Sequence, residues 1–210
     1  KNTLTMIGKG KSISHGVAAL EYDLAKEING QAVATEIARH ELYGCTGAEM
    51  VQEMKPYHID FPNVKNNCLR FEVSPSIEES ATFTDADWAE LGNDFMQRMG
   101  LANHQYIIIR HSGTESKKEQ AHLHILANRV SLSGELYRDN WIGKKATEAA
   151  NAIAKERNFV QSQDIGKVNK AEIKEAMDGV LKKMQGFDFT KFKEELGKRG
   201  FKVREARAST

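Results

Sequence analysis

The sequence predicts an α+β fold: a two-layer arrangement with a central antiparallel sheet and flanking helices, followed by a helical C-terminal extension. Strand and helix patterns are mixed through residues 1–160, whereas residues 161–210 carry helix patterns only. The composition, 40% hydrophobic and 28% charged with three prolines, is typical of a chain that buries a core. We therefore expect one domain over 1–160 and an extension over 161–210 that packs on it.

The first third of the chain is read from its periodicity. Residues 1–12 indicate a strand end and a loop, and residues 14–28 a helix with Val17, Leu20 and Leu24 on one stripe. Residues 30–66 contain several Gly and Pro and read as irregular, with a short helix near 46–54. In residues 68–74, hydrophobic odd positions alternate with polar even positions, which predicts a strand with one buried face.

The remaining elements follow in order. Thr84, as N-cap with Asp87 three residues later, opens a helix that Gly100 closes. Two apolar strands, 105–111 and 122–130, flank the polar loop 112–121 and form an antiparallel pair. The expected helices after that are 143–157, 169–185 and 189–199.

Bulk properties exclude several classes of protein. No apolar run approaches the length of a membrane-spanning helix, and no signal peptide is visible, so we expect a cytoplasmic protein without membrane association. Cys45 and Cys68 form no CxxC pair, which excludes a zinc knuckle. Residues 165–210 carry 12 Lys/Arg against 7 Asp/Glu, which fits either phosphate contacts or ordinary solvated helices. We expect the chain to be part of a longer protein, because it ends without a helix stop.

Three of the seven histidines lie within fourteen residues: His111, His122 and His124. Residues two apart on a strand point to the same face, so His122 and His124 present their imidazoles side by side. His111 meets them if the two strands form a hairpin. Three converging imidazoles favour a metal site with open positions, the catalytic arrangement, over polar residues scattered on a solvated face.

A metal-bound histidine commonly gives its other N–H to a carboxylate. Glu72, on the polar face of its strand, is the first candidate, and its alternative role is an ion pair with a nearby Lys or Arg. Glu115 and Glu119, in the polar loop, fit solvated positions better. All-nitrogen ligation suits manganese, zinc, cobalt or nickel better than magnesium, although availability in the cell also decides which ion binds.

The segment His122-Leu-His124-Ile-Leu-Ala-Asn128, after an apolar strand that ends in His111, resembles the third motif of the relaxases. These mobilisation nucleases nick plasmid or transposon DNA at an origin of transfer. The segment Arg70-Phe-Glu72 resembles the strand that bears an acidic residue in this family. Residues 141–158 and 186–203 are similar to segments that follow the motif, so the likeness covers most of the chain.

The resemblance implies a histidine-hydrophobic-histidine endonuclease fold and a tyrosine nucleophile near the N-terminus. Tyr22 matches that position best, and it lies about 140° from Val17 around the helix, off the apolar stripe. Tyr43 and Tyr57 remain alternatives, while Tyr106 alternates with core positions and reads as packing.

The resemblance also implies a divalent metal ion (Mn²⁺, Mg²⁺ or Zn²⁺), single-stranded DNA at the origin of transfer, and relaxosome accessory and coupling proteins as partners. Arg110, Asn128 and Arg129 are the candidate DNA contacts. One position departs from the family pattern: many relatives place an Asp two residues after the first His, where this chain has Gly113. The supporting carboxylate must then come from elsewhere, which makes Glu72 more important.

Other functions remain open at this point. A rolling-circle replication initiator or a single-strand transposase shares the fold, but its tyrosine commonly follows the histidine pair. Here Tyr22 precedes the pair by about 100 residues, which favours a relaxase. A metal-dependent phosphodiester hydrolase, or a binding module without activity, needs no tyrosine.

Overall fold

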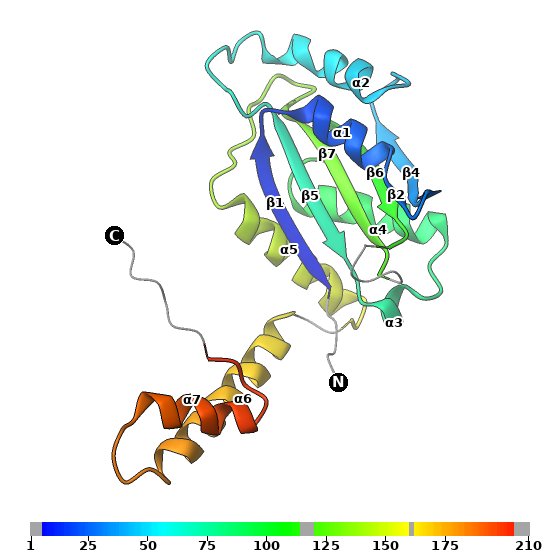
Figure 1. Ribbon diagram of the computed structural model, residues 1–210. Helices are drawn as coiled ribbons and strands as arrows, with labels where there is room; N and C mark the ends of the chain where they lie inside the picture. Colours follow the sequence, from blue (N-terminus) through cyan, green and yellow to red (C-terminus); the bar gives the residue numbers. More distant parts are fainter. Residues whose placement is uncertain (1–5, 114–119, 160–161, 204–210) are drawn as a thin grey trace. The chain divides into compact units, whose positions relative to one another are not determined.

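The computed structural model describes residues 6–113, 120–159 and 162–203 (Figure 1). Glu115 and Glu119 lie outside the described residues. The chain divides into two compact units, Lys1–Ser162 and Gln163–Thr210, and each is described by itself. That division does not test whether the two parts are separate domains, so the domain assignment stays a prediction.

The larger unit is built on a five-stranded sheet in the order β1-β5-β7-β6-β4, and all of its strand pairs are antiparallel. The strands are β1 (Ile7–Ile13), β4 (Ala34–His40), β5 (Cys68–Ser74), β6 (His104–His111) and β7 (His122–Ser131). The central β7 lies between β5 and β6. The strands expected over 68–74, 105–111 and 122–130 are confirmed, and the last two pair as predicted.

The two outer strands were predicted less well: residues 1–12 were expected to be a strand end and a loop, and residues 30–66 to be irregular. β1 alternates glycine with lysine, so it lacks the apolar side chains that mark a strand with one buried face. Its glycines instead allow close packing: a Cβ on Gly8 would lie 2.3 Å from the main-chain oxygen of Ala146 in the helix that covers this strand, and one on Gly10 would lie 2.8 Å from the Phe71 ring. β4 is an edge strand without a fully buried residue, so alternation is weak there. The prediction of irregular chain was therefore wrong over residues 34–40.

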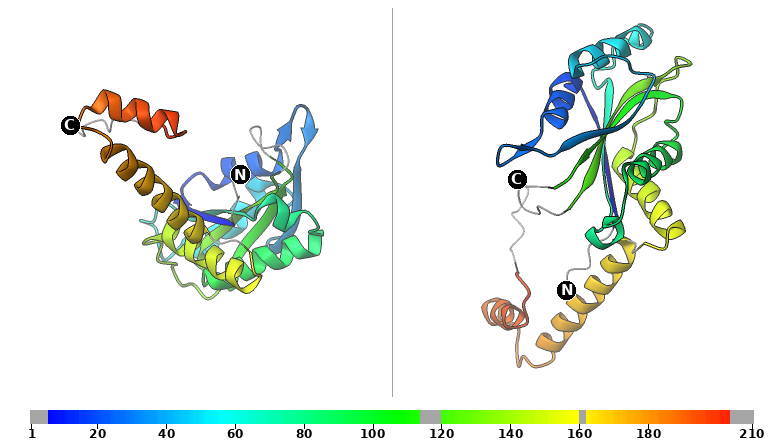
Figure 2. Two further views of the ribbon diagram at one scale, coloured as in Figure 1. Left: turned by 90° about the horizontal axis from the view of Figure 1, so that it is seen from below. Right: turned by 90° about the vertical axis from the view of Figure 1, so that its right-hand side faces the viewer.

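Helices lie on both faces of the sheet, which adds a third layer to the expected two (Figure 2). Helices α4 (Asp85–Arg98) and α5 (Ile142–Glu156) cover one face. Helices α1 (Gly16–Leu24) and α2 (Gly47–Met54) cover part of the other. The predicted α+β class, with a central antiparallel sheet and flanking helices, is confirmed.

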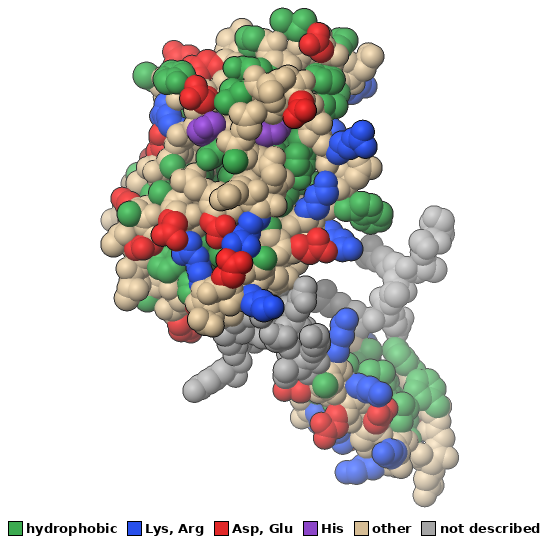
Figure 3. All heavy atoms as spheres, turned by 180° about the vertical axis from the view of Figure 1, so that it is seen from behind, with side chains coloured by type: hydrophobic (Ala, Val, Ile, Leu, Met, Phe, Trp, Pro, Cys, Tyr) green, Lys and Arg blue, Asp and Glu red, His purple; other side chains and the backbone are tan. Residues whose placement is uncertain are grey.

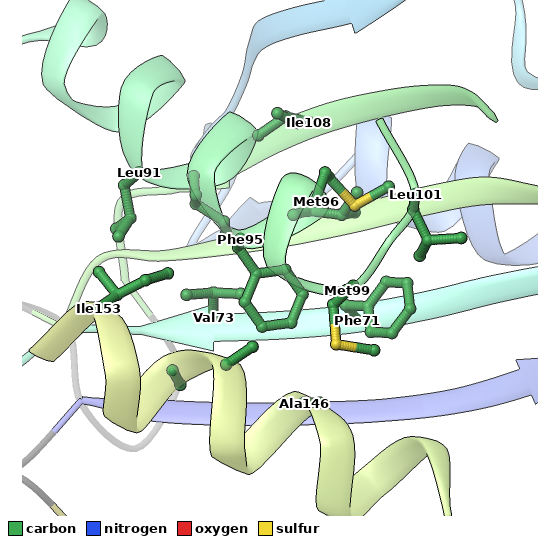
Figure 4. Packing of buried hydrophobic residues seen from close by; sticks show 14 of the residues in the cluster. Phe71, Val73, Leu91, Phe95, Met96, Met99, Leu101, Ile108, Ala146 and Ile153 are labelled. Atoms are coloured by element: carbon green, nitrogen blue, oxygen red, sulfur yellow. The ribbon is translucent and has the colours of Figure 1, made fainter. Parts of the chain in front are cut away.

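The larger core fills the space between the sheet and the pair α4 and α5 (Figure 4). Phe71 of β5 packs edge-to-face on Phe95 of α4, with the ring centroids 5.5 Å apart. Helix α4 begins at a capping box made by Thr84 and Asp87, as predicted, and Gly100 follows it with a φ of +73°. This core makes the sheet a rigid platform for whatever its opposite face carries.

The second core covers only part of that opposite face. It joins Leu20 of α1 and Met50 of α2 to Ile107, Ile109 and other inward residues of the strands. Beyond it, the same face of β6 and β7 carries histidines instead of aliphatic residues. The apolar layer therefore ends where the polar site begins.

Short elements complete the larger unit. They are β2 (Glu27–Ile28), β3 (Gln31–Ala32), α3 (Ile77–Ser80) and a 3-10 helix over Lys55–His58. Asn29 and Gly30 both have positive φ between β2 and β3, as a two-residue hairpin turn requires. The helix expected over 14–28 therefore stops at Leu24, because this hairpin follows it.

The smaller unit contains α6 (Ser162–Leu181) and α7 (Phe189–Lys198). Ala176 and Val180 of α6 pack against Phe192 and Leu196 of α7 in a core of their own. No helix in the described part of the chain is both long and apolar enough to cross a membrane.

Candidate metal centre

His111, His122 and His124 converge on one point of the sheet. His111 and His122 are direct partners across the antiparallel pair β6 and β7, and His124 lies two residues further along β7. One ring nitrogen from each of the three lies within 4.8 Å of the others. The convergence expected from strand parity is thus present.

The spacing of His122 and His124 fits a shared metal ion. Nε2 of His122 and Nε2 of His124 are 3.1 Å apart. Two nitrogens bound to one ion at about 2.1 Å each would lie about 3.0–3.4 Å apart at tetrahedral or octahedral angles. Three neutral imidazoles leave further coordination positions open, so the donor set suits a catalytic ion.

The outer nitrogens of two of these rings are already held. Nε2 of His111 donates to the main-chain oxygen of Asp23 at 2.7 Å, and Nδ1 of His122 donates to the main-chain oxygen of Gln120 at 3.2 Å. A ring that donates from one nitrogen carries a lone pair on the other. These bonds therefore set the tautomers that leave Nδ1 of His111 and Nε2 of His122 free to bind an ion.

Burial keeps the rings neutral. Burial lowers the pKa of His124 to about 2, and the nearby His111, His122 and Arg70 act in the same direction. Burial also lowers the pKa of His111, partly offset by its bond to the Asp23 main chain. Neutral imidazole is the form that ligates metal, so the site is prepared for an ion near neutral pH.

Among the described residues, Asp23 of α1 brings a carboxylate to this cluster, and the sequence reasoning missed it. Its side chain is 1% exposed and accepts two hydrogen bonds from Arg70, at 3.1 and 2.5 Å. Burial raises the pKa of Asp23, and Arg70 opposes that rise. Oδ1 of Asp23 lies 3.9 Å from Nδ1 of His124. The available signal was a charged residue at a buried helical position, three residues after Leu20.

Glu72 lies on the same face, in direct register with His124 across β5 and β7. Its carboxylate forms an ion pair with Lys9, at 2.9 Å, and that pair is open to solvent. The structure thus shows Glu72 in its alternative role, and the carboxylate that faces a histidine is that of Asp23.

Tyr22 immediately precedes Asp23, and its side chain is 57% exposed. Its hydroxyl accepts a hydrogen bond of 2.7 Å from Nζ of Lys26. Tyr43 is also exposed, but its hydroxyl is bonded to Glu41 in the segment that leads to α2. Tyr106 is buried and donates to Asn93, as a packing residue would. Of these three tyrosines, Tyr22 is adjacent in the chain to a residue that contacts the histidines.

The three candidate DNA contacts all have partners within the chain. Asn128 is fully buried, and its side chain contacts His58, Gln105 and main-chain atoms, so it has no free atom for DNA. Arg129 holds Asp139 and main-chain oxygens, and Arg110 pairs with Asp85 at the start of α4. Because both arginines differ in parity from the histidines, they lie on the opposite face of the sheet. Neither arginine therefore lies on the histidine face, and DNA contact by the three residues stays a prediction.

A pocket of about 210 Å³ adjoins the histidines and shares His124 as a wall. Lys9, Lys11 and Arg70 line it, with Glu72 as the acidic residue, and these side chains share the histidine face of β1 and β5. On the face covered by α4 and α5, by contrast, acidic and basic side chains of the larger unit are interspersed (Figure 3). The pocket therefore places positive charge next to the metal centre.

Comparison with known protein families gives a match over most of the larger unit. A family model described as the relaxase nuclease domain, MobA/VirD2-like, matches residues 22–159, which is well over half of the chain. The matched segment begins at Tyr22 and includes all three histidines. No curated protein matches the chain.

Proposed function

The chain belongs to the MobA/VirD2-like relaxases, a family of DNA-nicking enzymes, and we propose that it nicks one strand at an origin of transfer through Tyr22 with a divalent metal ion. One observation carries the proposal. The residue that follows Tyr22 contacts His111, so the chain brings a candidate nucleophile to the edge of a three-histidine cluster. A nucleophile and a metal centre on adjacent elements are what a covalent phosphoryl transfer needs.

His111, His122 and His124 would hold the ion, which we propose is Mn²⁺, Mg²⁺ or Zn²⁺. Once bound, such an ion polarises a non-bridging oxygen of the scissile phosphate and offsets charge that develops there. The histidines hold no net charge themselves, so the full charge of the ion acts on the phosphate. Asp23 and Gln120 keep two of the rings in the orientation this requires.

Tyr22 supplies the nucleophile. Its oxygen forms a bond to phosphorus while the bond from phosphorus to the 3′ oxygen breaks, and the 3′ oxygen leaves as a hydroxyl. The product is a 5′ phosphotyrosyl link, which conserves the bond energy for religation. Lys26 places a positive charge at the Tyr22 oxygen, where negative charge develops as the proton leaves.

We propose that the DNA strand passes through the pocket on the histidine face of β1 and β5. Lys9, Lys11 and Arg70 offer donors to consecutive phosphates, next to His124. Phosphate contacts of this kind provide affinity without reading sequence. As a DNA-transfer enzyme of the cytoplasm, the protein would work with relaxosome accessory and coupling proteins.

Covalent capture tests this function. The protein is incubated with Mn²⁺ and a pool of random single-stranded oligonucleotides, and adducts are isolated in denaturing detergent and sequenced. We expect adducts enriched for one sequence, lost in Tyr22→Phe and kept in the matched control Tyr43→Phe. Cleaved DNA without any adduct would instead indicate a hydrolase, and binding without cleavage would indicate a module that has no activity.

A further inference from the structure

We infer that Asp23 is the positioning residue of the metal centre, in place of the family's acidic residue after the first histidine. Two of its groups act on two ligands: the main-chain oxygen on His111 and the carboxylate on His124. The inference rests on the proposed function only in taking the three histidines as ligands. It links the nucleophile to the metal, since Asp23 is covalently joined to Tyr22.

The first step concerns the proton on His124. In the structure, Nε2 of His124 faces Nε2 of His122, whose lone pair is exposed because its Nδ1 donates to Gln120. His124 must therefore donate from Nε2 there, and its Nδ1 accepts from Arg70 at 3.4 Å. To ligate through Nε2, His124 has to carry its proton on Nδ1 instead.

The second step concerns which group can accept a hydrogen bond from a protonated Nδ1 of His124. Arg70 has donors only. Among the contacts described at Nδ1 of His124, the Asp23 carboxylate is the acceptor, and an approach of about 1 Å would bring the pair to hydrogen-bond distance. Arg70 holds that carboxylate at the site with two bonds, so it is in place before an ion arrives.

The third step separates Asp23 from Glu72. Glu72 is in register with His124, but its carboxylate is turned to Lys9 and to solvent. A buried carboxylate acts through a low dielectric and is not screened by salt, whereas an exposed one is. Asp23 is therefore the stronger support, and Glu72→Gln serves as the matched control.

The test measures metal binding, not nicking. Mn²⁺ affinity is measured by calorimetry, and the visible spectrum of the Co²⁺-loaded protein reports ligand geometry. We expect Asp23→Asn to weaken Mn²⁺ binding about 10- to 100-fold and to change the Co²⁺ bands, as loss of an outer-shell partner does. Glu72→Gln should leave the affinity within threefold and the bands unchanged. The reverse pattern would overturn the inference.

A double variant separates orientation from charge neutralisation. Asp23→Asn leaves Arg70 unpaired beside His124, which alone would repel an ion and destabilise the fold. Asp23→Asn with Arg70→Gln removes that charge, and we expect its Mn²⁺ affinity to remain at least tenfold weak and its Co²⁺ bands altered. Full recovery of both would show that Asp23 only neutralises Arg70, and would overturn the inference. A wild-type protein that binds no metal would overturn the proposed function as well, whereas normal metal binding without DNA adducts would leave the inference standing.

Discussion

The main-chain oxygen of Asp23 accepts a hydrogen bond of 2.7 Å from Nε2 of His111, a residue 88 positions later in the chain. This bond joins the helix that carries Tyr22 to the strand that carries the first metal-ligand candidate. Because the acceptor is a main-chain atom, the bond depends on where α1 lies and not on the side chain of residue 23. Placement of the nucleophile helix and the tautomer of His111 are thus parts of one arrangement.

Substitution of one histidine of the cluster should weaken metal binding. His122→Ala removes one of three nitrogen ligands, and we expect Mn²⁺ affinity to fall by at least 100-fold, with nicking lost in parallel. Calorimetry on the folded protein measures this. His15→Ala is the control, because His15 is an exposed helix-cap residue without a side-chain cap bond. Equal metal affinity in His122→Ala and wild type would exclude His122 as a ligand.

Acid should destabilise the metal-free protein. The folded-state pKa of His124 is lowered to about 2, so below pH 6.5 the unfolded state binds a proton that the folded state does not. Stability is therefore full above pH 6.5 and falls with pH below it, by up to about 1.4 kcal/mol per pH unit for one such histidine. Urea unfolding with a chelator at pH 7 and pH 5 measures the difference.

His124→Gln isolates that contribution, since it removes the titrating ring while keeping a polar side chain. We expect the variant to lose less stability between pH 7 and pH 5 than wild type does. An equal loss in both proteins would mean that His124 is not kept neutral by burial.

The glycines of β1 should be needed for packing. Gly8→Ala places a Cβ 2.3 Å from the Ala146 main-chain oxygen, so β1 and α5 must move apart, at a cost of about 1–3 kcal/mol or more. Gly143→Ala is the matched control within α5, because its nearest atom, the Gly10 oxygen, is 3.5 Å away. We expect that variant to be neutral or slightly stabilised. Thermal unfolding that ranks the two variants the other way would contradict the packing of α5 on β1.

The lysines of β1 should contribute salt-dependent affinity for single-stranded DNA. Lys11→Ala removes one phosphate contact from the pocket, so we expect weaker binding to all sequences and a salt slope smaller by about 0.7. Fluorescence anisotropy over a range of salt concentrations measures it. Lys144→Ala, which removes an exposed lysine of α5, should leave the salt slope unchanged. A larger effect of Lys144→Ala than of Lys11→Ala would contradict the proposal that the DNA strand binds in the pocket.

The elements and residues that could be predicted from the sequence are those whose structure depends on neighbours in the chain. Those that depend on residues close only in space could not be predicted. The strands of the site follow from local alternation, and the parity of His122 and His124 fixes their shared face. The same parity applied to Arg110 and Arg129 places them on the opposite face, which the sequence reasoning did not use. β1 has no apolar signal, because its glycines are explained by residues distant in sequence: Gly8 packs against Ala146 of α5 and Gly10 against Phe71 of β5.

Asp23 could not be assigned from the sequence either, because its contacts are with residues distant in the chain. Its role depends on Arg70 and His124, which come from two strands distant in sequence and are brought together only by strand order. A buried helical position occupied by a charge hints at a partner but does not name one. Glu72, by contrast, has the expected strand parity, yet its partner Lys9 belongs to a strand that the sequence did not reveal.

The most direct test of the central claim is to locate the covalent link. The wild-type protein is trapped on its single-stranded DNA substrate with Mn²⁺, digested with trypsin and nuclease, and analysed by mass spectrometry. We predict one modified peptide, carrying a nucleotide on the oxygen of Tyr22. A nucleotide on Tyr43, Tyr57 or any other residue, or cleavage with no modified peptide, would contradict the account.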